Sequence, residues 1–383
     1  MKNLAILGST GSVGKSTLEV VRRNNDKFQI NLLAANKNFE LMLQQMHEFE
    51  PKFIYLKDPE AQKSFIKGSK NLKLKTTLLT SEDELMDNLS SQESEIIVAA
   101  MVGVAGLKPV YHAVKNGKHI LLANKESYVV AGEMLNKLSK ETGSTIFPID
   151  SEHSAIHQCL MGIEDKRSVS RIILTGSGGP FLDRDINDFD DITPEEATAH
   201  PIWKMGEKIS VDSSTMMNKC LEIIEARWLF DVKNIDVLIH PEGIVHSLVE
   251  FTDKSVIAQL SEPDMKIPIA YGLAFPERIT SGSNSIDFEE FNKLSFRKPD
   301  YEKFPALGLA KNCIAEGGSS FAILNAANEE CVNAFLKGKI KYLDIFKIIS
   351  KVLDKSSIKD VKDLNDIFES DTESRERSKE LIN

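Results

Sequence analysis

The chain has 383 residues, a formal net charge of −10, 42% hydrophobic residues and 27% charged residues. This length is too great for one ordinary hydrophobic core, so two or three domains are expected. The balance of apolar and charged residues is that of a soluble globular protein. The acidic excess argues against a general nucleic-acid-binding protein, although it is compatible with a local basic pocket for a phosphate, and no apolar run is long enough to cross a membrane.

The N-terminus and the cysteines predict a cytoplasmic protein. Residues 1–3 lead directly into an apolar strand, without the pattern of a signal or transit peptide. The four cysteines form neither a Cys-x-x-Cys pair nor a zinc-binding spacing; they are Cys159, Cys220, Cys313 and Cys331. Buried free thiols of this kind are typical of a reducing compartment.

A glycine-rich loop follows the first predicted strand, at 3–8, and precedes a predicted helix at 15–24. Its glycines are Gly8, Gly11 and Gly14. Strand, glycine loop and helix together form the context of a phosphate-binding turn. The dinucleotide fingerprint G-x-G-x-x-G and the P-loop G-x-x-x-x-G-K-[ST] both need glycine at position 9, which is a serine here. The loop alone therefore leaves a dinucleotide and a nucleoside triphosphate as alternatives.

The next predicted strand, at 28–35, bears on this choice because it ends in Asn36, Lys37 and Asn38. An NAD-binding protein places an acid about twenty residues beyond the loop for the ribose 2′-hydroxyl. A lysine between two amides instead suits a 2′-phosphate, so we predict NADP, with Lys37 and Asn38 at that phosphate. The alternative is an ordinary polar turn.

Helices and strands are predicted to alternate over the first 150 residues. The predicted helices are 39–49, 58–67, 82–89, 103–116 and 128–142, and the strands are 53–56, 74–79, 95–100 and 119–123. Near-continuously apolar strands alternating with helices predict a doubly wound, Rossmann-like parallel sheet. The strand at 119–123 ends in Asn124-Lys125-Glu126-Ser127, a charged cluster expected at the crevice edge of the sheet.

A last apolar stretch, at 145–149, runs into Asp150, Ser151 and Glu152. In an extended segment, residues two apart point to the same side, so both carboxylates would face one way. Such a pair favours a shared proton or cation, and oxygen ligands suit Mg2+ or Mn2+. The alternative is an exposed loop that caps the next helix, predicted to continue from Ser154 to about Met161.

Beyond this point the predicted strands are separated by longer loops, which indicates an α+β second domain. A strand at 171–175 leads to a glycine-rich loop at 176–180 that could bring backbone amides close to an anion. The polar segment 183–208 is predicted to be a disordered loop or a functional lid. Trp203 within it must bury its ring against either a bound ligand or the protein surface.

Residues 210–215 are predicted to cap a helix that runs to about Leu229. One polar stripe of that helix comprises Asn218, Glu222 and Glu225, with Lys219 beside it. It is either a solvated face or a site for phosphate at the helix start and metal one turn on. The apolar stripe of the same helix is predicted to belong to the core.

Three further strands, at 237–240, 247–251 and 256–260, are typical of an antiparallel sheet. His240 and His246 lie among them, where lone histidines are more often structural than catalytic. Helical periodicity at 306–315, 320–336 and 342–353 predicts a small helical bundle. The charged tail after Lys355 is expected to pack weakly.

Together these residues resemble the 1-deoxy-D-xylulose 5-phosphate reductoisomerase family over essentially the whole chain. The motifs that carry the resemblance are GSTGSVG (8–14), LLANKES (121–127), PIDSEHSAI (148–156), LTGSGGPF (174–181), HPIWKMG (200–206), ISVDSSTMMNKCLEIIEARWLF (209–230), HPEGIVHSLVEF (240–251) and the helix around 325–335. The resemblance implies an oxidoreductase and isomerase that makes 2-C-methyl-D-erythritol 4-phosphate in non-mevalonate isoprenoid synthesis. It also implies NADPH, one Mg2+ or Mn2+ ion, a small phosphorylated sugar substrate and a homodimer.

The resemblance assigns site residues as follows. Those implied to contact the cofactor are Thr10, Gly11, Ser12, Val13, Asn36, Lys37, Asn38, Asn124, Glu126 and Gly206. Those implied to bind the metal are Asp150, Glu152 and Glu222. Those implied to contact substrate are Glu152, Glu222, Lys125, Ser151, Ser177, His200, Ser213, Asn218 and Lys219, with Ser177, Ser213, Asn218 and Lys219 around its phosphate. Trp203 and Met205 are implied to belong to the lid, and Asn36 stands where many relatives carry glycine.

The implied chemistry agrees with these residue types. A metal ion would act as a Lewis acid on the hydroxy-ketone, and NADPH would reduce the rearranged aldehyde. Lys125 would stabilise negative charge on oxygen, and the lid would exclude water. Retro-aldol and ketol routes both stay open for the rearrangement, as do the roles of His153, Glu225 and His246.

The domains expected are an NADP-binding domain at 1–150, a catalytic and dimerisation domain at 151–280, a linker at 281–305 and a helical domain at 306–383. Three other functions compete. A P-loop kinase would need glycine at position 9 and would consume ATP. A non-catalytic NADP-binding scaffold would have no use for three separated carboxylates, and a generic NADP-dependent aldehyde reductase would not need a metal.

Overall fold

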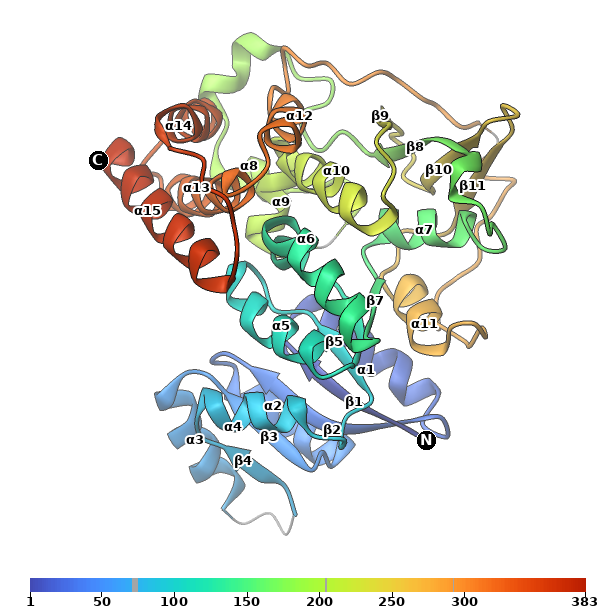
Figure 1. Ribbon diagram of the computed structural model, residues 1–383, viewed down its shortest axis with the longest axis vertical. Coiled ribbons are helices and arrows are strands. Elements are labelled where there is room, and N and C mark those ends of the chain that lie inside the picture. The colour runs from blue at the N-terminus through green and yellow to red at the C-terminus, as the bar shows by residue number, and fades with distance from the viewer. Residues whose placement is uncertain (71–74, 204, 292) are drawn as a thin grey trace. The chain divides into compact units, whose positions relative to one another are not determined.

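A computed structural model describes residues 1–70, 75–203, 205–291 and 293–383 of the chain (Figure 1). It divides into two compact units. The first comprises residues 1–127, 135–154 and 264–284, and the second comprises 128–134, 155–263 and 285–383. The division into domains at 150, 280 and 305 stays a prediction.

The first unit is built on a seven-stranded sheet with the order β4-β3-β2-β1-β5-β6-β7. Its strands are β1 (Lys2–Leu7), β2 (Phe28–Ala35), β3 (Phe53–Leu56), β4 (Thr77–Leu79), β5 (Ile96–Ala99), β6 (His119–Leu122) and β7 (Thr145–Pro148). Every neighbouring pair is parallel. The strand order reverses at β1, and open α/β sheets bind their ligands at such a switch point.

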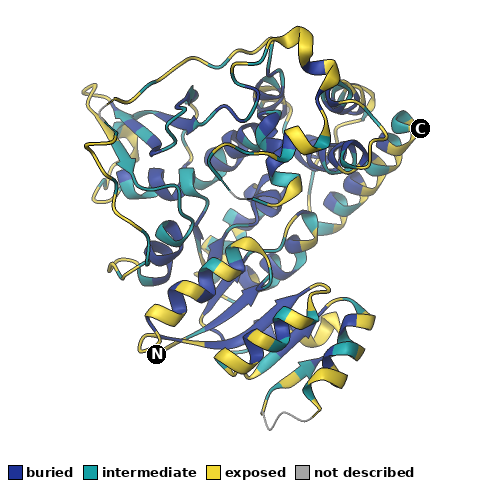
Figure 2. Cartoon of the chain, turned by 180° about the vertical axis from the view of Figure 1, so that it is seen from behind, coloured by how far each residue is buried: buried dark blue, intermediate teal, exposed yellow. Residues whose placement is uncertain are grey.

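Helices cover this sheet. They are α1 (Ser12–Arg23), α2 (Phe39–Phe49), α3 (Pro59–Ser69), α4 (Glu82–Ser90), α5 (Leu107–Lys115), α6 (Lys125–Thr142) and α11 (Lys266–Ala274), with a 3-10 turn η1 (Val104–Gly106) before α5. Residues 128–134 of α6 belong to the second unit. Figure 2 shows buried strands and helices whose outer faces are exposed. Consecutive buried residues such as Leu4, Ala5 and Ile6 are expected where both faces of a parallel sheet are covered. The predicted doubly wound sheet is confirmed.

The second unit holds a four-stranded sheet with the order β11-β10-β8-β9. Its strands are β8 (Val169–Gly176), β9 (Ile235–Ile239), β10 (Val245–Phe251) and β11 (Val256–Leu260). β10 is antiparallel to β8 and β11, so the predicted antiparallel sheet is confirmed for these strands, but it was wrong for β9, which is parallel to β8. The long helical connection between β8 and β9 is the kind of crossover that a parallel pair needs.

Helices make up the rest of this unit. They are α7 (Ser151–Cys159), α8 (Pro194–Thr198), α9 (Glu207–Ser214), α10 (Met217–Phe230), α12 (Ala306–Glu316), α13 (Ser320–Leu336), α14 (Tyr342–Lys355) and α15 (Leu364–Ile382), with 3-10 turns η2 (Lys166–Ser168) and η3 (Ile186–Asp191). The first turn of α7 belongs to the first unit. The predicted α+β region and C-terminal helices are confirmed.

The segment 183–208 is not the unstructured loop that its composition predicted, because η3, α8 and the start of α9 lie within it. Thr193 and Glu196 form a capping box that starts α8, with Pro194 in its first turn. Phe189 in η3 is 1% exposed and therefore docks this segment onto the unit. Residue 204 lies outside the described residues.

The C-terminal tail does not pack weakly. α15 runs for 19 residues and buries Ile367 together with a stripe of serines at four-residue spacing: Ser370, Ser374 and Ser378. The Ser374 hydroxyl donates to the Ile323 carbonyl on α13 at 3.0 Å. Small polar side chains, rather than large apolar ones, form this contact face, which is why hydrophobic periodicity did not reveal it.

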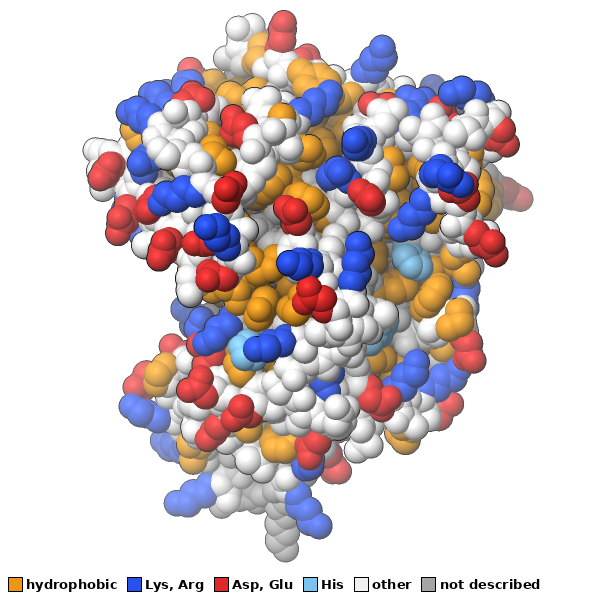
Figure 3. Space-filling view, viewed as in Figure 1, with side chains coloured by type: hydrophobic (Ala, Val, Ile, Leu, Met, Phe, Trp, Pro, Cys, Tyr) orange, Lys and Arg blue, Asp and Glu red, His pale blue; other side chains and the backbone are white. Residues whose placement is uncertain are grey.

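On the face drawn in Figure 3, acidic and basic side chains of the described residues are interspersed. The net charge of −10 is therefore not gathered there into one acidic field. Among the helices of the described residues, none has both the length and the apolar character needed to span a bilayer.

Candidate active site

The glycine loop after β1 is closely packed against the backbone around it. Gly8 has φ +94, and a side chain there would place its Cβ 2.4 Å from the Ala100 carbonyl oxygen. A Cβ on Gly14 would lie 2.3 Å from the Gly8 carbonyl oxygen. Gly11 is the N-cap of α1 and makes no side-chain cap, and Gly11 and Ser12 are exposed. The first-turn N–H groups of α1 can therefore receive an anion such as a pyrophosphate.

The departure from the glycine fingerprints at Ser9 has a structural reason. The Ser9 hydroxyl donates to Gln45 Oε1 at 2.8 Å, and the Gln45 amide donates to the Ser9 carbonyl at 2.9 Å. Both residues are buried, so this serine ties the glycine loop to α2. Glycine at position 9 would leave the Gln45 side chain with one fewer partner.

The polar turn after β2 contains a helix cap, Asn38, and an exposed lysine, Lys37. Asn38 Oδ1 accepts from the Leu41 N–H at 3.0 Å and caps α2, which is the ordinary role of such a residue. Asn36, Lys37 and Asn38 are all exposed. The exposed Lys37 can therefore attract a phosphate.

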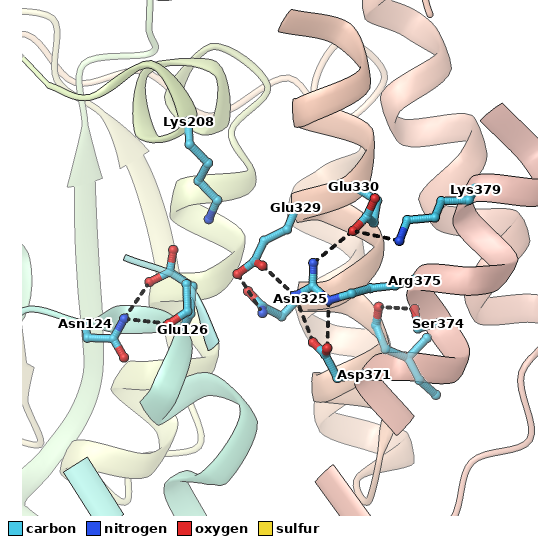
Figure 4. Close-up of polar contacts among 12 residues, drawn as sticks. Asn124, Glu126, Lys208, Asn325, Glu329, Glu330, Asp371, Ser374, Arg375 and Lys379 are labelled. Carbon is cyan, nitrogen blue, oxygen red and sulfur yellow. Dashed lines mark hydrogen bonds and ion pairs between the residues drawn. The ribbon is translucent and has the colours of Figure 1, made fainter. Parts of the chain in front are cut away.

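Asn124, at the end of β6, is a structural junction of the first unit. Its Oδ1 accepts from the Ser127 N–H at 3.2 Å, and its amide donates to the Gly103 carbonyl at 3.0 Å and to Glu126 Oε2 at 3.3 Å (Figure 4). A Cβ on Gly106 would lie 2.7 Å from Asn124 Oδ1. Asn124 therefore fixes the loop after β5 at the carboxyl edge of the sheet.

A charged group surrounds Asp150, which follows β7. The Lys125 ammonium lies 3.2 Å from Asp150 Oδ2, and His153 Nδ1 lies 3.4 Å from the same oxygen. The Ser151 hydroxyl donates to Glu152 Oε2. β7 ends at Pro148 and α7 begins at Ser151, so the extended segment predicted for Asp150 and Glu152 was wrong. The two carboxylates instead lie at the start of a helix, whose dipole favours negative charge.

In the second unit, His200 connects its own segment, between α8 and α9, to the loop after β8. His200 Nδ1 accepts from the N–H groups of Ile202 at 3.2 Å and Trp203 at 2.9 Å. In a neutral imidazole the proton therefore sits on Nε2, which lies 3.2 Å from Ser177 Oγ. Ser177 Oγ also accepts from the Gly179 N–H at 3.3 Å. With this tautomer the Ser177 oxygen accepts both bonds, so its own hydroxyl can act as a donor to a ligand.

The helix predicted to run to about Leu229 is α10, but its predicted cap at residues 210–215 is corrected, because residues 210–214 form the end of a separate helix, α9. α9 ends at Ser214, α10 begins at Met217, and Met216 between them has φ 60. Ser213 is thus in the last turn of α9. A Cβ on Gly179 would lie 3.0 Å from the Ser213 carbonyl oxygen, so the loop after β8 packs directly on this turn.

The start of α10 completes this group. A Cβ on Gly176 would lie 3.0 Å from Lys219 Cε, which places the lysine against the end of β8. The Lys219 ammonium and the Asn218 amide both donate to the buried Glu222 carboxylate. The second unit therefore brings together six predicted site residues from the loop after β8, the segment after α8, and the helices α9 and α10. They are Ser177, His200, Ser213, Asn218, Lys219 and Glu222.

Trp203 docks on the protein in the described structure. Its ring lies edge-on to His246, with centroids 6.2 Å apart. His246 Nε2 also lies 3.1 Å from the Ser261 carbonyl oxygen, so His246 links β10 to the residue after β11. Met205 is half-buried, and Gly206 is the exposed N-cap of α9. The role of His246, open from the sequence, includes a contact with the predicted lid.

Sequence patterns did not predict the side chains that hold the turn between α9 and α10. Asn328 donates to Asp212 Oδ1 at 2.8 Å, and the Tyr342 hydroxyl donates to the Ser214 carbonyl at 2.7 Å. For Asn328 the sequence does hold one signal: it is a polar residue in the largely apolar helix α13, and buried polar groups need specific partners.

A glycine turn at the switch point of a parallel sheet, together with a built anion-binding group and buried carboxylates, defines a dinucleotide-dependent oxidoreductase. Three family models match the chain. The model described as 1-deoxy-D-xylulose 5-phosphate reductoisomerase matches residues 4–132, that of its C-terminal domain matches 146–230, and the DXP reductoisomerase C-terminal domain matches 260–377.

Relatives match over the full length. The 1-deoxy-D-xylulose 5-phosphate reductoisomerases of Haemophilus ducreyi and Thermodesulfovibrio yellowstonii are each 46% identical, covering 100% of this chain and 99% and 100% of their own. A solved structure of DOX-P reductoisomerase in complex with NADPH, fosmidomycin and magnesium superimposes with a TM-score of 0.96 at 41% identity, covering 100% of this chain and 98% of the other. The chain belongs to the 1-deoxy-D-xylulose 5-phosphate reductoisomerase family.

Proposed function

We propose that this chain converts 1-deoxy-D-xylulose 5-phosphate into 2-C-methyl-D-erythritol 4-phosphate, using NADPH and a divalent cation, in non-mevalonate isoprenoid synthesis. The observation that carries the proposal is the group in the second unit that surrounds Ser177, Ser213 and Lys219, in a chain related over its full length to enzymes of that name. Hydroxyl, amide and ammonium donors around a glycine loop suit a phosphate monoester.

The cofactor contacts proposed for the first unit fit its geometry. Thr10, Gly11, Ser12 and Val13 would hold the pyrophosphate at the exposed start of α1, and Asn36, Lys37 and Asn38 would face the 2′-phosphate. Asn124, Glu126 and Gly206 would line the nicotinamide half. When bound, NADPH supplies the hydride that reduces the aldehyde. The solved relative that carries NADPH supports this assignment.

We assign one Mg2+ or Mn2+ ion to Asp150, Glu152 and Glu222. Three carboxylates are the hard oxygen donors that such ions prefer. Each is already oriented by donors of its own unit: Lys125 beside Asp150, Ser151 on Glu152, and Lys219 on Glu222. The bound cation supplies Lewis acidity toward the substrate oxygens. Lys125 would stabilise negative charge developing on substrate oxygen, and Ser151 would contact the substrate.

The phosphate of the substrate would lie against the donors of the second unit. Ser177 presents its hydroxyl proton, and Ser213, Asn218 and Lys219 present theirs from the ends of α9 and α10. His200 both orders the Ser177 loop and receives the N–H groups of residues 202 and 203. Trp203 and Met205 would move with the segment that contains His200, between α8 and α9, and would cover the substrate, excluding water from the aldehyde.

We also propose that the protein is a homodimer of the cytoplasm. β11 is an edge strand of its sheet, and its Val256 and Ile257 are 48% and 45% exposed. An exposed apolar edge strand is a ready site for pairing with a second chain. The four cysteines are free and buried, which suits a reducing compartment.

One assay separates this function from its competitors. NADPH consumption is followed with 1-deoxy-D-xylulose 5-phosphate, with and without EDTA, and product formation is checked by mass spectrometry. We expect turnover that EDTA abolishes and Mg2+ restores, and a large loss of turnover in Glu152→Gln at unchanged NADPH affinity. Turnover insensitive to EDTA would indicate a generic reductase. NADPH binding without turnover would leave only a scaffold, and ATP consumption would indicate a kinase.

A further inference from the structure

Two side chains from the C-terminal helices hold the turn between α9 and α10 from behind. Asn328 on α13 donates to Asp212 Oδ1 at 2.8 Å, and Tyr342 on α14 donates from its hydroxyl to the Ser214 carbonyl at 2.7 Å. The residues that they bind flank Ser213, which belongs to the proposed phosphate site. Asp212, Asn328 and Tyr342 are all buried, so these are interior contacts of the second unit.

The turn needs external support because its backbone is unfavourable. Met216 has φ 60, a left-handed conformation that a residue with a side chain adopts only when its surroundings enforce it. Carbonyl groups at the end of a helix lack partners within the helix. Tyr342 supplies that partner for Ser214, and burial raises the pKa of Tyr342, which keeps its hydroxyl a donor.

Asp212 needs Asn328 for a different reason. Its carboxylate is 1% exposed and lies 2.8 Å from the Lys208 ammonium, one turn earlier in α9. The Lys208–Asp212 ion pair lies within α9, whereas the Asn328 hydrogen bond connects Asp212 to α13. Among the described residues its own buried Oδ1 accepts no hydrogen bond, which indicates that Asp212 alone determines how this amide is turned.

α13 is itself anchored by α15. Arg375 binds three carboxylates at once: Asp371 at 2.7 Å, Glu330 at 3.1 Å and Glu329 at 2.6 Å (Figure 4). Asn325, one turn before Asn328 on α13, donates to Glu329 at 3.1 Å. The helix that carries Asn328 is thus fixed at the residues adjacent to it.

We propose that Asn328 and Tyr342 are positioning residues for the phosphate of the substrate. Through Asp212 and the Ser214 carbonyl they hold Ser213, Asn218 and Lys219 in binding geometry, so the C-terminal helices set substrate affinity without touching the substrate. This inference rests on the proposed function, because it takes those three residues as the phosphate ligands.

The test compares Tyr342→Phe and Asn328→Ala with Ile349→Val, a truncation of a fully buried residue on α14. Inorganic phosphate is used as a competitive probe. In both positioning variants we expect KM for the substrate and Ki for phosphate to rise together, about tenfold. KM for NADPH should hold, and kcat should fall far less than KM rises. Ile349→Val should lower the melting temperature and leave KM and Ki unchanged.

Unchanged KM and Ki in folded Tyr342→Phe and Asn328→Ala would overturn the inference. It would also be overturned if these two variants changed kcat, KM and melting temperature in the same way as Ile349→Val does. If the wild-type chain shows no turnover, the proposed function fails instead. Phosphate binding is then titrated directly by calorimetry, and the same about tenfold weakening in both variants is still required.

Discussion

The two units hold their proposed site residues by different means. In the first unit, backbone geometry places them: each group follows a strand of one parallel sheet, and glycines allow the close approach of loop and helix. In the second unit, side chains place them: a left-handed residue joins two helices, and buried hydrogen bonds from other helices hold the junction. Substitutions that add atoms, such as glycine to alanine, should therefore disturb the first unit most. Substitutions that remove a hydrogen-bonding side chain should disturb the second unit most.

The largest effect is expected from the carboxylates, one from each unit. Asp150→Asn and Glu222→Gln should each lower kcat/KM by about 10³-fold, or about 4 kcal/mol, if both bind the same cation. The measurement is steady-state turnover at saturating Mg2+, with NADPH affinity followed by fluorescence. Glu133→Gln serves as a control, because Glu133 is an exposed carboxylate on α6 and is not among the proposed ligands. Near-normal turnover in only one of the two variants would argue against a shared ion.

Arg375 tests the dependence of the second unit on side chains. Burial alone would lower its pKa, but hydrogen bonds and charge from Asp371 and Glu329 raise the pKa well above its ordinary value. Arg375→Met leaves three partly buried carboxylates together and should cost about 3 kcal/mol of unfolding free energy. Urea unfolding measures this loss.

Arg227→Met provides the matched control. Arg227 is 22% exposed, close to the 21% of Arg375, but its partner Asp231 is 86% exposed. We expect a loss of at most about 0.5 kcal/mol, because an exposed ion pair contributes little. Equal losses in the two variants would show that the Arg375 network does not support this unit.

Gly14 tests the dependence of the first unit on backbone approach. Gly14→Ala would bring a Cβ to 2.3 Å from the Gly8 carbonyl oxygen, so the loop must move away from α1. NADPH affinity should fall roughly 100-fold, or ~2.7 kcal/mol. Isothermal calorimetry measures it. Gly308→Ala, where nothing lies within 4 Å of the new atom, should leave NADPH affinity unchanged.

Lys37 sharpens the same comparison at an exposed position. Lys37→Ala should weaken NADPH binding about tenfold, or ~1.4 kcal/mol, and leave NADH binding unchanged, because only NADPH carries the 2′-phosphate. Lys57→Ala changes an exposed lysine after the neighbouring strand β3 and is the control. An equal loss of NADPH and NADH affinity would show that Lys37 contributes only general positive charge and does not recognise the 2′-phosphate.

The first unit was predictable from the sequence almost residue by residue. The strands at 28–35 and 53–56 and the helix at 39–49 have the predicted bounds, because apolar runs end at clear turn signals. The glycine loop and the polar residues after each strand follow from the same logic, since parallel strands deliver their carboxyl ends to one edge. The error at α7 arose because Asp150 and Ser151 were treated as extended rather than as a helix start.

The second unit was less predictable because tertiary contacts determine its local structure. No glycine marks the left-handed Met216, so residues 210–215 were predicted as a cap for the following helix and not as the end of a helix of their own. The serine face of α15 is small and polar, so its burial was not foreseen. The polar stripe with Asn218 and Glu222 was nevertheless predictable, because its spacing belongs to α10 itself; its role as a site stays a prediction.

The smallest expected effect concerns one histidine from each unit. Burial lowers the pKa of His119, and burial together with the charge of Lys166 lowers the pKa of His157, so both are held neutral in the folded chain. A histidine with a lowered folded pKa contributes stability above its unfolded pKa of about 6.5 and loses it as the pH falls further. The melting temperature should therefore fall between about pH 7 and pH 5, and His119→Gln and His157→Gln should each flatten that fall. NMR titration checks the cause directly: an imidazole pKa at or above 6.5 in either residue would remove that residue from the explanation.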